Sequence, residues 1–445
     1  MKRRATRPRR PYLVSLTLLV LAGLLSAAPS SPAPPLAHRE LLPNGIVLLV
    51  AERPAVPIVS VRVYSRAGAA FDPPDRAGLA NLTGELLTRG TAKRTGQQID
   101  TAIEFVGGRL EAGAGRDGLT TSLAVLARDL PLGLDLLQDV VLTPTFPEAE
   151  LKRKAAEIQA AIQRSEENPG AVAGRALAKL VFGAHPYGRP VEGTRESVGR
   201  LTRDDVVRFY GERVRPDSTI IAVVGAVTTA DVRREILARF GGWARPAAPA
   251  PGVPFAAVGT PPGTDTIKRD LTQTTLLLGR TVVNQTDPDY YPLVVASYVL
   301  GGGSASRLYA RVREESGLAY AVYGGVTPGK YGALFAVSAQ TRTAEATKVM
   351  GLIEAELTRM QREPVPDGEL AVAKDYLVGS FPLRLDTSSK VADFLVGVEE
   401  MGLGLDYADR YRALIGRVTG ADVQRVATKY FGPPTFSRVL VGRMP

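Results

Sequence analysis

The sequence of 445 residues contains no cysteine, only two histidines and a single tryptophan. Without cysteine, the chain cannot form a disulfide, a thiolate zinc site, a cysteine nucleophile or the acylated cysteine of a lipoprotein anchor. Hydrophobic residues make up 45% of the chain and charged residues 22%. This composition is typical of a globular protein, and the length predicts roughly two to four domains or subdomains.

The formal net charge is +10, but much of it lies in one short segment. The basic residues of segment 1–28 are Lys2, Arg3, Arg4, Arg7, Arg9 and Arg10. The segment contains no acidic residue, so the rest of the chain carries +4. No basic stripe with interleaved aromatic residues follows, and nucleic acid is therefore not an expected partner.

The same segment predicts export. Its basic stretch precedes an apolar run of 17 residues, 12–28, which small residues and prolines follow. A membrane-spanning helix needs about 20 apolar residues, so we expect residues 1–28 to be a cleaved signal peptide. An uncleaved anchor in the inner membrane, formed by residues 12–28, is the alternative. The sequence RRPYLV weakly resembles a twin-arginine signal, and the expected location is the periplasm of a bacterium.

Proline and glycine are concentrated in the stretch ARPAAPAPGVPFAAVGTPPGTD, residues 244–265. Such a composition excludes a regular helix and favours an extended linker. The linker separates two predicted domains of similar size, residues 37–243 and residues 266–445.

The two predicted domains contain an internal repeat. Residues 201–225, LTRDDVVRFYGERVRPDSTIIAVVG, align with residues 418–442, VTGADVQRVATKYFGPPTFSRVLVG, at a constant offset of 217 without a gap. In both copies a threonine, Thr202 or Thr419, precedes a helix whose third residue is acidic, as in a capping box. A proline loop and an apolar strand ending in glycine follow. The repeat indicates duplicated domains.

Each domain begins with strands and continues into helices. The stretches GIVLLVAE, PIVSVRVYSRAG and TQTTLLLGRTVV are rich in β-branched residues and predict strands. Helices are predicted over residues 148–166 and 343–362. The expected fold class is α+β, with two homologous domains that each pack helices on one face of a mostly antiparallel sheet.

The stretch GLANLTGELLTRGT, residues 78–91, resembles the zinc-motif region of the pitrilysin/insulinase peptidases, the inverzincins. In that family Gly-Leu-Ala precedes H-x-x-E-H and Gly-Thr closes the segment; both flanks stand here at the family's separation. Two later stretches extend the resemblance: HPYGRPVEGTRESVGRLTRDDVVRFY, residues 185–210, and GGGSASRLYARVREESGLAYAVYG, residues 301–324. The resemblance implies the two-domain pitrilysin/LuxS-like fold.

The family's zinc chemistry needs residues that this sequence lacks. Two histidines four residues apart on one helical face bind the metal, and the glutamate between them takes a proton from zinc-bound water. In this sequence these positions hold Asn81, Gly84 and Glu85, and the family's third ligand best matches Glu157. The resemblance therefore implies a vestigial site without imidazole ligands or general base.

Two interpretations of these vestigial positions remain open. Asn81, Glu85 and Glu157 offer oxygen atoms, which suit Ca²⁺, Mg²⁺ or Mn²⁺ better than zinc. The favoured interpretation is a relic pocket held by hydrogen bonds and water, with no metal. The chain's two histidines do not replace the lost ligands: His38 is expected in the tail after the export segment, and His185 in a structural loop.

The second domain keeps an arginine and a tyrosine seven residues apart, Arg313 and Tyr320. The resemblance implies that such a pair reaches the active site from the C-terminal half. The tyrosine would donate a hydrogen bond to the scissile carbonyl and the arginine would hold the substrate backbone. Ser304 or Ser306 is expected to cap the helix through Arg313, Gly317 to end it, and Tyr320 to open the next strand.

Other residues near this pair are weaker candidates. Arg307 and Tyr309 lie in the same predicted helix but lack the spacing match. The three glycines of GGGSASRL could cradle an anion at a helix start, but the sequence lacks the G-K-[ST] end of a phosphate loop. We expect them to allow a tight turn between two helices.

These observations predict a non-catalytic subunit of a heterodimeric zinc metallopeptidase. This chain would supply Arg313 and Tyr320, and a homologous partner would supply H-x-x-E-H and Zn²⁺; no cofactor is expected in this chain itself. The alternative is a peptidase-like scaffold or binding protein without a proteolytic role. A self-sufficient peptidase with an unusual metal is a third interpretation.

Overall fold

The computed structural model describes residues 35–248, 252–257 and 260–443. The predicted signal or anchor at residues 1–28 lies outside these ranges, as do parts of the predicted linker. Among the described residues, no helix has both the length and the apolar character needed to cross a membrane.

The first half folds around a mixed sheet with the strand order β1-β2-β6-β3-β5-β4. Its strands are β1 (His38–Leu41), β2 (Val47–Glu52), β3 (Ile58–Ser65), β4 (Arg109–Ala114), β5 (Leu119–Leu126) and β6 (Thr219–Gly225). The strands pair antiparallel apart from β2 with β6. His38 opens the edge strand β1, so its expected place in a tail was wrong.

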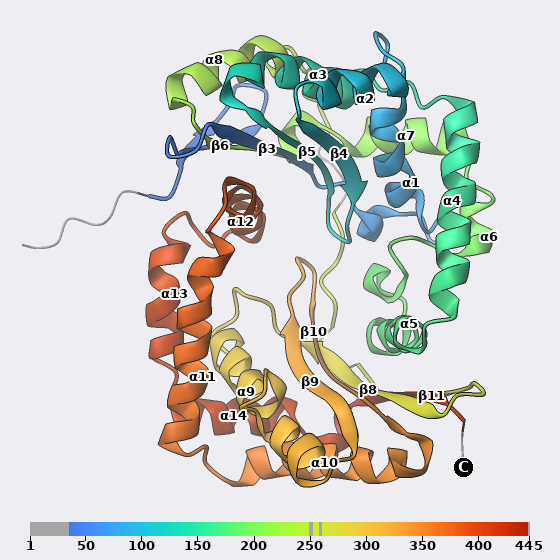
Figure 1. Ribbon diagram of the computed structural model, residues 1–445, viewed down its shortest axis with the longest axis vertical. Helices are drawn as coiled ribbons and strands as arrows, with labels where there is room; N and C mark the ends of the chain where they lie inside the picture. Colours follow the sequence, from blue (N-terminus) through green and yellow to red (C-terminus); the bar gives the residue numbers. More distant parts are fainter. Residues whose placement is uncertain (1–34, 249–251, 258–259, 444–445) are drawn as a thin grey trace, which may run out of the picture. The chain divides into compact units, whose positions relative to one another are not determined.

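Helices cover the outer face of this sheet and its end (Figure 1). They are α1 (Leu79–Leu86), α2 (Gly96–Phe105), α3 (Leu130–Leu142), α4 (Glu148–Glu166), α5 (Pro169–Phe182), α6 (Arg195–Val198), α7 (Arg203–Arg213) and α8 (Thr229–Phe240). Ile103 of α2, Leu137 of α3 and Ile236 of α8 are buried against β-branched residues of β3 and β6. The helix α4 has the bounds that the sequence predicted.

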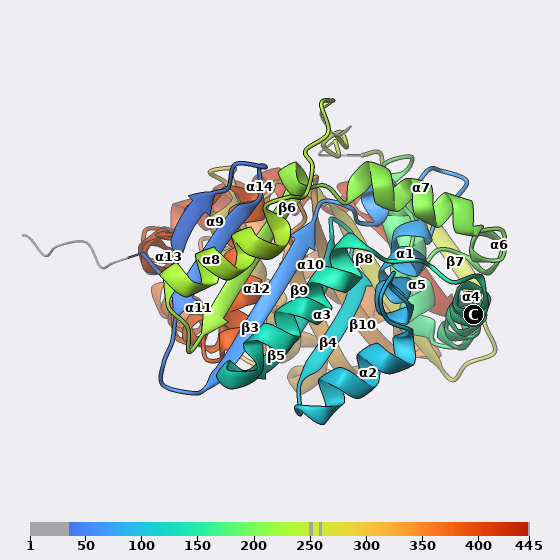
Figure 2. The same ribbon diagram turned by 90° about the horizontal axis from the view of Figure 1, so that it is seen from above.

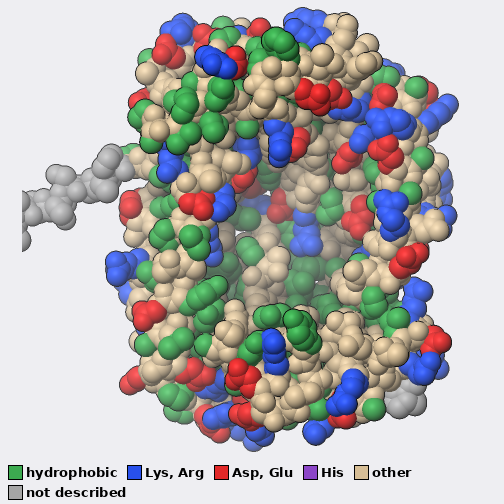
Figure 3. Space-filling view, in the orientation of Figure 1, with side chains coloured by type: hydrophobic (Ala, Val, Ile, Leu, Met, Phe, Trp, Pro, Cys, Tyr) green, Lys and Arg blue, Asp and Glu red, His purple; other side chains and the backbone are tan. Residues whose placement is uncertain are grey.

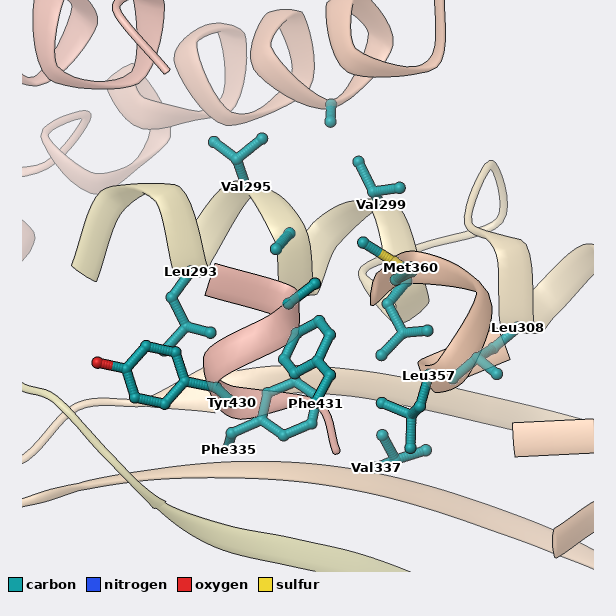
Figure 4. Close-up of a cluster of buried hydrophobic side chains, with 14 of the residues drawn as sticks. Leu293, Val295, Val299, Leu308, Phe335, Val337, Leu357, Met360, Tyr430 and Phe431 are labelled. Atoms are coloured by element: carbon teal, nitrogen blue, oxygen red, sulfur yellow. The ribbon is translucent and has the colours of Figure 1, made fainter. Parts of the chain in front are cut away.

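The second half has the strand order β7-β11-β8-β10-β9. Its strands are β7 (Thr264–Lys268), β8 (Gln273–Val282), β9 (Ala319–Thr327), β10 (Ala333–Arg342) and β11 (Ser437–Gly442). Its helices are α9 (Tyr290–Gly301), α10 (Ala346–Arg362), α11 (Asp367–Ser380), α12 (Ser388–Met401), α13 (Tyr407–Gly416) and α14 (Gly420–Tyr430). Figure 4 shows the core between α9, α10, α14 and the sheet, where Phe335 stacks on Phe431.

The topology confirms the repeat. In each half the last strand runs parallel to one neighbour and antiparallel to the other: β6 between β2 and β3, β11 between β7 and β8. The helices before these strands, α7 and α14, both begin with a capping box in which the threonine oxygen accepts the N–H of the third residue. The two halves are therefore two copies of one α+β unit.

The inner face of each sheet is partly covered by a helix from the opposite half, which the sequence did not reveal. Leu395 of α12 is buried against β6 and Tyr64 of the first sheet. In return, Leu177 and Val181 of α5 are buried against β11 of the second sheet. This exchange buries apolar surface between the halves, which stabilises their association.

Charged groups also join the halves. The buried Arg62 guanidinium on β3 donates to Asp393 at 2.6 Å, and Arg66 donates to the buried Glu400 at 2.7 Å; both acids lie on α12. The turn between β4 and β5 also contacts the turn between β9 and β10. There the backbone N–H of Lys330 donates to the carboxylate of Asp117 at 3.1 Å. Breaking a buried pair leaves an unpaired charge, so these contacts fix how α12 lies on the first sheet.

Asp289, at the start of α9, holds α14 in place. Its carboxylate accepts hydrogen bonds from Arg425, from Lys429 at 2.7 Å and from Tyr430 at 3.0 Å. Burial alone would raise the pKa of Asp289, but these donors outweigh it and lower the pKa to about 2. The ionised form therefore stabilises the fold above about pH 4, and this contribution is lost as the pH falls towards 2.

We expect Asp289→Asn to lower the free energy of unfolding by about 2 kcal/mol at pH 7. The difference from the unsubstituted protein should shrink below pH 4, as measured by urea denaturation at several pH values. Asp270→Asn is the control, because Asp270 makes an exposed ion pair with Arg443. An equal loss of stability in both variants would contradict the role given to Asp289.

Candidate functional site

The helix that carries the vestigial zinc motif is held by a buried aspartate. Asp72 accepts the backbone N–H groups of Gly78 and Ala80, each at 2.8 Å, where α1 begins. Burial raises the pKa of Asp72 to about 7, although the two N–H groups oppose the rise. Gly78 has a φ of 92°, a left-handed conformation that favours glycine. The lead-in residues thus set the position of α1.

A lysine side chain lies between the two vestigial carboxylates. The ammonium of Lys154 on α4 donates to Glu85 at 3.0 Å and lies 3.3 Å from Glu157. Arg153 donates to the other oxygen of Glu157 at 2.5 Å. Glu85 and Glu157 occupy positions that hold metal ligands in an intact site. Here both carboxylates contact basic side chains of α4 instead. Together with the half-buried Asn81, this donor set does not fit a zinc ion, which needs unprotonated nitrogen, sulfur or oxygen ligands around it.

The general-base position has no room for a side chain. A Cβ atom on Gly84 would lie 2.8 Å from the backbone nitrogen of Ala114 and the carbonyl carbon of Gly113. Both residues belong to β4, so α1 packs directly on the backbone of this edge strand. The missing glutamate has therefore been replaced by close helix–strand packing, which the sequence motif alone did not indicate.

Lys154→Met is expected to raise the pKa of Glu157. The hydrogen bond from Lys154 is the largest cause that lowers this pKa, and Arg153 adds to it. Carboxyl resonances followed by NMR through an acid titration would report the change. Lys152→Met is the control, because Lys152 on the same helix pairs with Glu148 instead; a similar shift in both variants would contradict the arrangement.

The structure brings Arg313 and Tyr320 together. The guanidinium carbon of Arg313 lies 5.0 Å from the ring centroid of Tyr320 and 4.8 Å from that of Tyr309. Both distances are within cation–π range. Stacking between two rings fixes a guanidinium while leaving the N–H groups at its edge available for a ligand. Tyr309, a weaker candidate from the sequence, is thus part of the cluster.

Arg313 and Tyr320 both lie where the backbone is irregular, and these irregularities set the direction of their side chains. Arg313 lies in the π-helix η6 (Tyr309–Glu315), a rare form that is frequent at functional sites. Gly317, with a φ of 61°, ends the helix as predicted. The expected serine cap is absent from the described residues, because Ser306 donates to the carbonyl of Gly303. On β9, Tyr320 is the extra residue where the pairing with β10 shifts, and such a bulge turns a side chain outward; Tyr320 is 81% exposed.

Arg313 differs in its ion pairing from the nearby arginines Arg307 and Arg311. The buried Arg307 makes two hydrogen bonds to Glu369, at 2.8 and 2.7 Å, and is a structural residue. Arg311 pairs with Glu315 one helical turn away. Within the described residues no carboxylate pairs with Arg313. An arginine held by aromatic rings with free donors is suited to bind carbonyl or carboxylate oxygens.

The remaining inner faces of the two sheets are open and border a hollow. Thr120 and Ser122 on β5 are half-buried, and Tyr323, Ser338 and Gln340 on β9 and β10 are exposed. Figure 1 shows β4 and β5 above β9 and β10, Figure 2 shows the first sheet in front of the second, and Figure 3 shows the hollow between them in the orientation of Figure 1. In Figure 3 basic and acidic side chains are interspersed on the face that opens into it, without a continuous field of one sign.

Neither histidine lies at the vestigial site. His185 is held in its loop by the N–H of Tyr187 at 3.2 Å and by a hydrogen bond with the carbonyl of Pro254 at 2.8 Å. His38 lies on β1, at the opposite edge of the first sheet from β4, the strand on which α1 packs. In the part of the chain that the structure describes, no group of three or more His, Cys, Asp or Glu residues could hold a metal ion.

Comparisons with known proteins agree with this geometry. Residues 47–195 match the family model described as insulinase (peptidase family M16), and residues 200–377 match the model described as peptidase M16 inactive domain. An uncharacterised zinc protease of Streptomyces coelicolor is 30% identical over 89% of this chain and 87% of its own length. The chain belongs to peptidase family M16.

Other relatives and solved structures match most of the chain. An uncharacterised zinc protease of Mycobacterium leprae is 31% identical over 79% of each chain. The crystal structure of an M16 inactive domain from Pseudomonas fluorescens is 25% identical, with a TM-score of 0.86 over 92% of this chain and 98% of its own. A protease from Helicobacter pylori, 19% identical, shares the fold with a TM-score of 0.85. The chain is thus an inactive-type M16 member with the pitrilysin-like two-domain fold.

Proposed function

We propose that this chain is the non-catalytic subunit of a heterodimeric M16 metallopeptidase. A homologous partner would carry H-x-x-E-H and its Zn²⁺, which polarises the scissile carbonyl and activates water. This chain would supply Arg313 and Tyr320 and one wall of the enclosing chamber. The observation that carries the proposal is the contrast between the two halves. The zinc positions are closed by Lys154 and β4, whereas Tyr320 stays exposed and stacks on the half-buried Arg313, which makes no ion pair within the described residues.

The proposed chemistry follows from the donors of the pair. The hydroxyl of Tyr320 would donate a hydrogen bond to the carbonyl oxygen of the scissile peptide as negative charge develops there. Arg313 would bind a neighbouring backbone carbonyl of the same substrate, which fixes the peptide in register. Neither residue needs to gain or lose a proton. Their contribution is to position the substrate and to stabilise charge.

We place the complex outside the cytoplasm on the sequence of residues 1–28 alone. The basic start and the apolar run of residues 12–28 support export to the periplasm, with an anchor in the inner membrane if the segment stays uncleaved. Peptides are the proposed substrates. The mixed surface charge in Figure 3 gives no support for nucleic acid as a partner.

Co-expression with a homologous H-x-x-E-H chain tests the proposal. We expect a one-to-one complex in native mass spectrometry that contains one zinc ion and cleaves an unstructured peptide. A partner chain that forms no complex with this protein under these conditions would contradict the proposal. A stable complex whose activity does not depend on Arg313 or Tyr320 would indicate a scaffold instead.

A further inference from the structure

The tyrosine-rich part of the C-terminal half is hollowed beside β9. A cavity of about 330 Å³ lies between α9, β9, α11 and the segment that contains Arg384 and α13. This volume is within the usual range for small-ligand sites, about 300–1,000 Å³. Among the described residues, the tyrosines that line it are Tyr290, Tyr291, Tyr298, Tyr407 and Tyr411. The walls therefore present aromatic surface with hydroxyl groups between the rings.

One guanidinium supplies the charge of this cavity. Arg384 is exposed, and its guanidinium carbon lies 5.7 Å from the ring centroid of Tyr411 and 5.5 Å from that of Phe381. No aspartate or glutamate lines the cavity, and within the described residues Arg384 makes no ion pair. A cation held on two rings and left without a counter-ion is suited to bind a carboxylate.

Two glycines border the cavity on the strand side. Gly324 and Gly325 of β9 both line it. Gly324 packs against Gly301 of α9, whereas a Cβ atom on Gly325 would meet no atom within 4 Å. Because Gly325 pairs with Ala336, which lies on the inner face of the sheet, a side chain at residue 325 would point towards the hollow, and at this position the strand borders the cavity through its backbone atoms.

We propose that this cavity binds the carboxyl-terminal residue of a peptide, with an aromatic side chain among the tyrosines and the terminal carboxylate on Arg384. The assignment to a peptide rests on the proposed function. Offset or edge-to-face contacts with the tyrosine rings favour an aromatic side chain over an aliphatic one of similar size. The unpaired guanidinium favours a free carboxylate over an amide.

The cavity also has a fixed relation to Tyr320. Gly325 follows Tyr320 by five residues on β9, which corresponds to about 17 Å in an extended strand. A peptide whose last residue occupies the cavity and which runs extended along β9 would bring a residue about five positions earlier to Tyr320. The cavity thus acts as an anchor for peptide ends at a set distance from the Arg313–Tyr320 pair.

Calorimetric titration of the single chain tests the site without a partner. The probes are N-acetyl-Ala-Ala-Ala-Phe, the same peptide with a carboxyl-terminal amide, the peptide with alanine in place of phenylalanine, and phenylacetate. We expect the free acid to bind at least about 10-fold more tightly than each of the other three. Equal binding of acid and amide would overturn the role of Arg384, and phenylacetate binding as tightly as the peptide would overturn the assignment to peptides.

Two variants locate the binding. Tyr298→Ala, which removes an aromatic wall of the cavity, should weaken binding of the free acid at least about 10-fold, whereas Phe105→Ala, at an exposed aromatic residue of α2, should leave it unchanged. Arg384→Gln should remove the preference for acid over amide, with Arg362→Gln as its control. Retained affinity in Tyr298→Ala, with a native circular dichroism spectrum, would overturn the proposal. Failure to form the heterodimer would leave these single-chain results intact, so the two ideas can fail separately.

Discussion

Restoring the motif by Asn81→His, Gly84→Glu and Glu85→His is expected to destabilise the chain and to produce no peptidase. The Cβ of residue 84 would lie 2.8 Å from backbone atoms of β4, and backbone cannot move aside as a flexible side chain can. Overpacking of this kind costs about 3 kcal/mol of unfolding free energy. The ammonium of Lys154 would also repel a metal ion beside the new histidines.

Urea denaturation and elemental analysis for zinc would check this result. Asn81→His alone serves as the matched control, because residue 81 is half-buried and this variant keeps Gly84 at the tight contact with β4. Gly84→Ala should already carry much of the loss, since the clash begins at Cβ. A triple variant that binds one zinc ion and cleaves peptide would show that α1 can move away from β4, contrary to our account.

In the assembled complex, Tyr320→Phe is expected to lower kcat/KM about 100-fold. Loss of one hydrogen bond to a developing oxyanion has an effect of about 10²–10³ in enzymes that use such donors. The phenylalanine keeps the ring that stacks on Arg313, so the complex should assemble as before. Tyr323→Phe on the same strand is the control, because Tyr323 is 49% exposed but lacks the stacked arginine.

Arg313→Ala should also lower activity, and its effect should be larger on KM than that of Tyr320→Phe because arginine would bind substrate before the transition state. Arg311→Ala removes an arginine of the same helix that pairs with Glu315 and should have little effect. Unchanged kinetics in Arg313→Ala and Tyr320→Phe would contradict the assigned roles and favour a scaffold.

Local features of this fold could be predicted because they depend on residues close in sequence. The capping boxes at Thr202 and Thr419, the end of the helix at Gly317 and the bounds of α4 all follow from short-range hydrogen bonds and side-chain patterns. The strand-to-helix order of each half followed from the β-branched stretches at its start. The sequence also identified Arg313 and Tyr320, which the structure brings together.

Features that depend on packing could not be predicted. Lys154 lies among other basic residues of α4, and only the crossing of α4 against α1 directs it to Glu85. The amphipathic patterns of α5 and α12 indicate buried faces, but they do not say that each helix covers the sheet of the opposite half. Likewise, the tyrosines of the cavity are spread over more than a hundred residues, and no local motif unites them.

The central claim is that this chain lacks a working metal site and completes one in a partner. Adding this protein stepwise to a fixed amount of the H-x-x-E-H chain, while following peptide cleavage, tests it most directly. We expect no cleavage by either chain alone and a rise in rate that levels off at one equivalent. Cleavage by this chain alone, or a partner that is fully active before any addition, would contradict it.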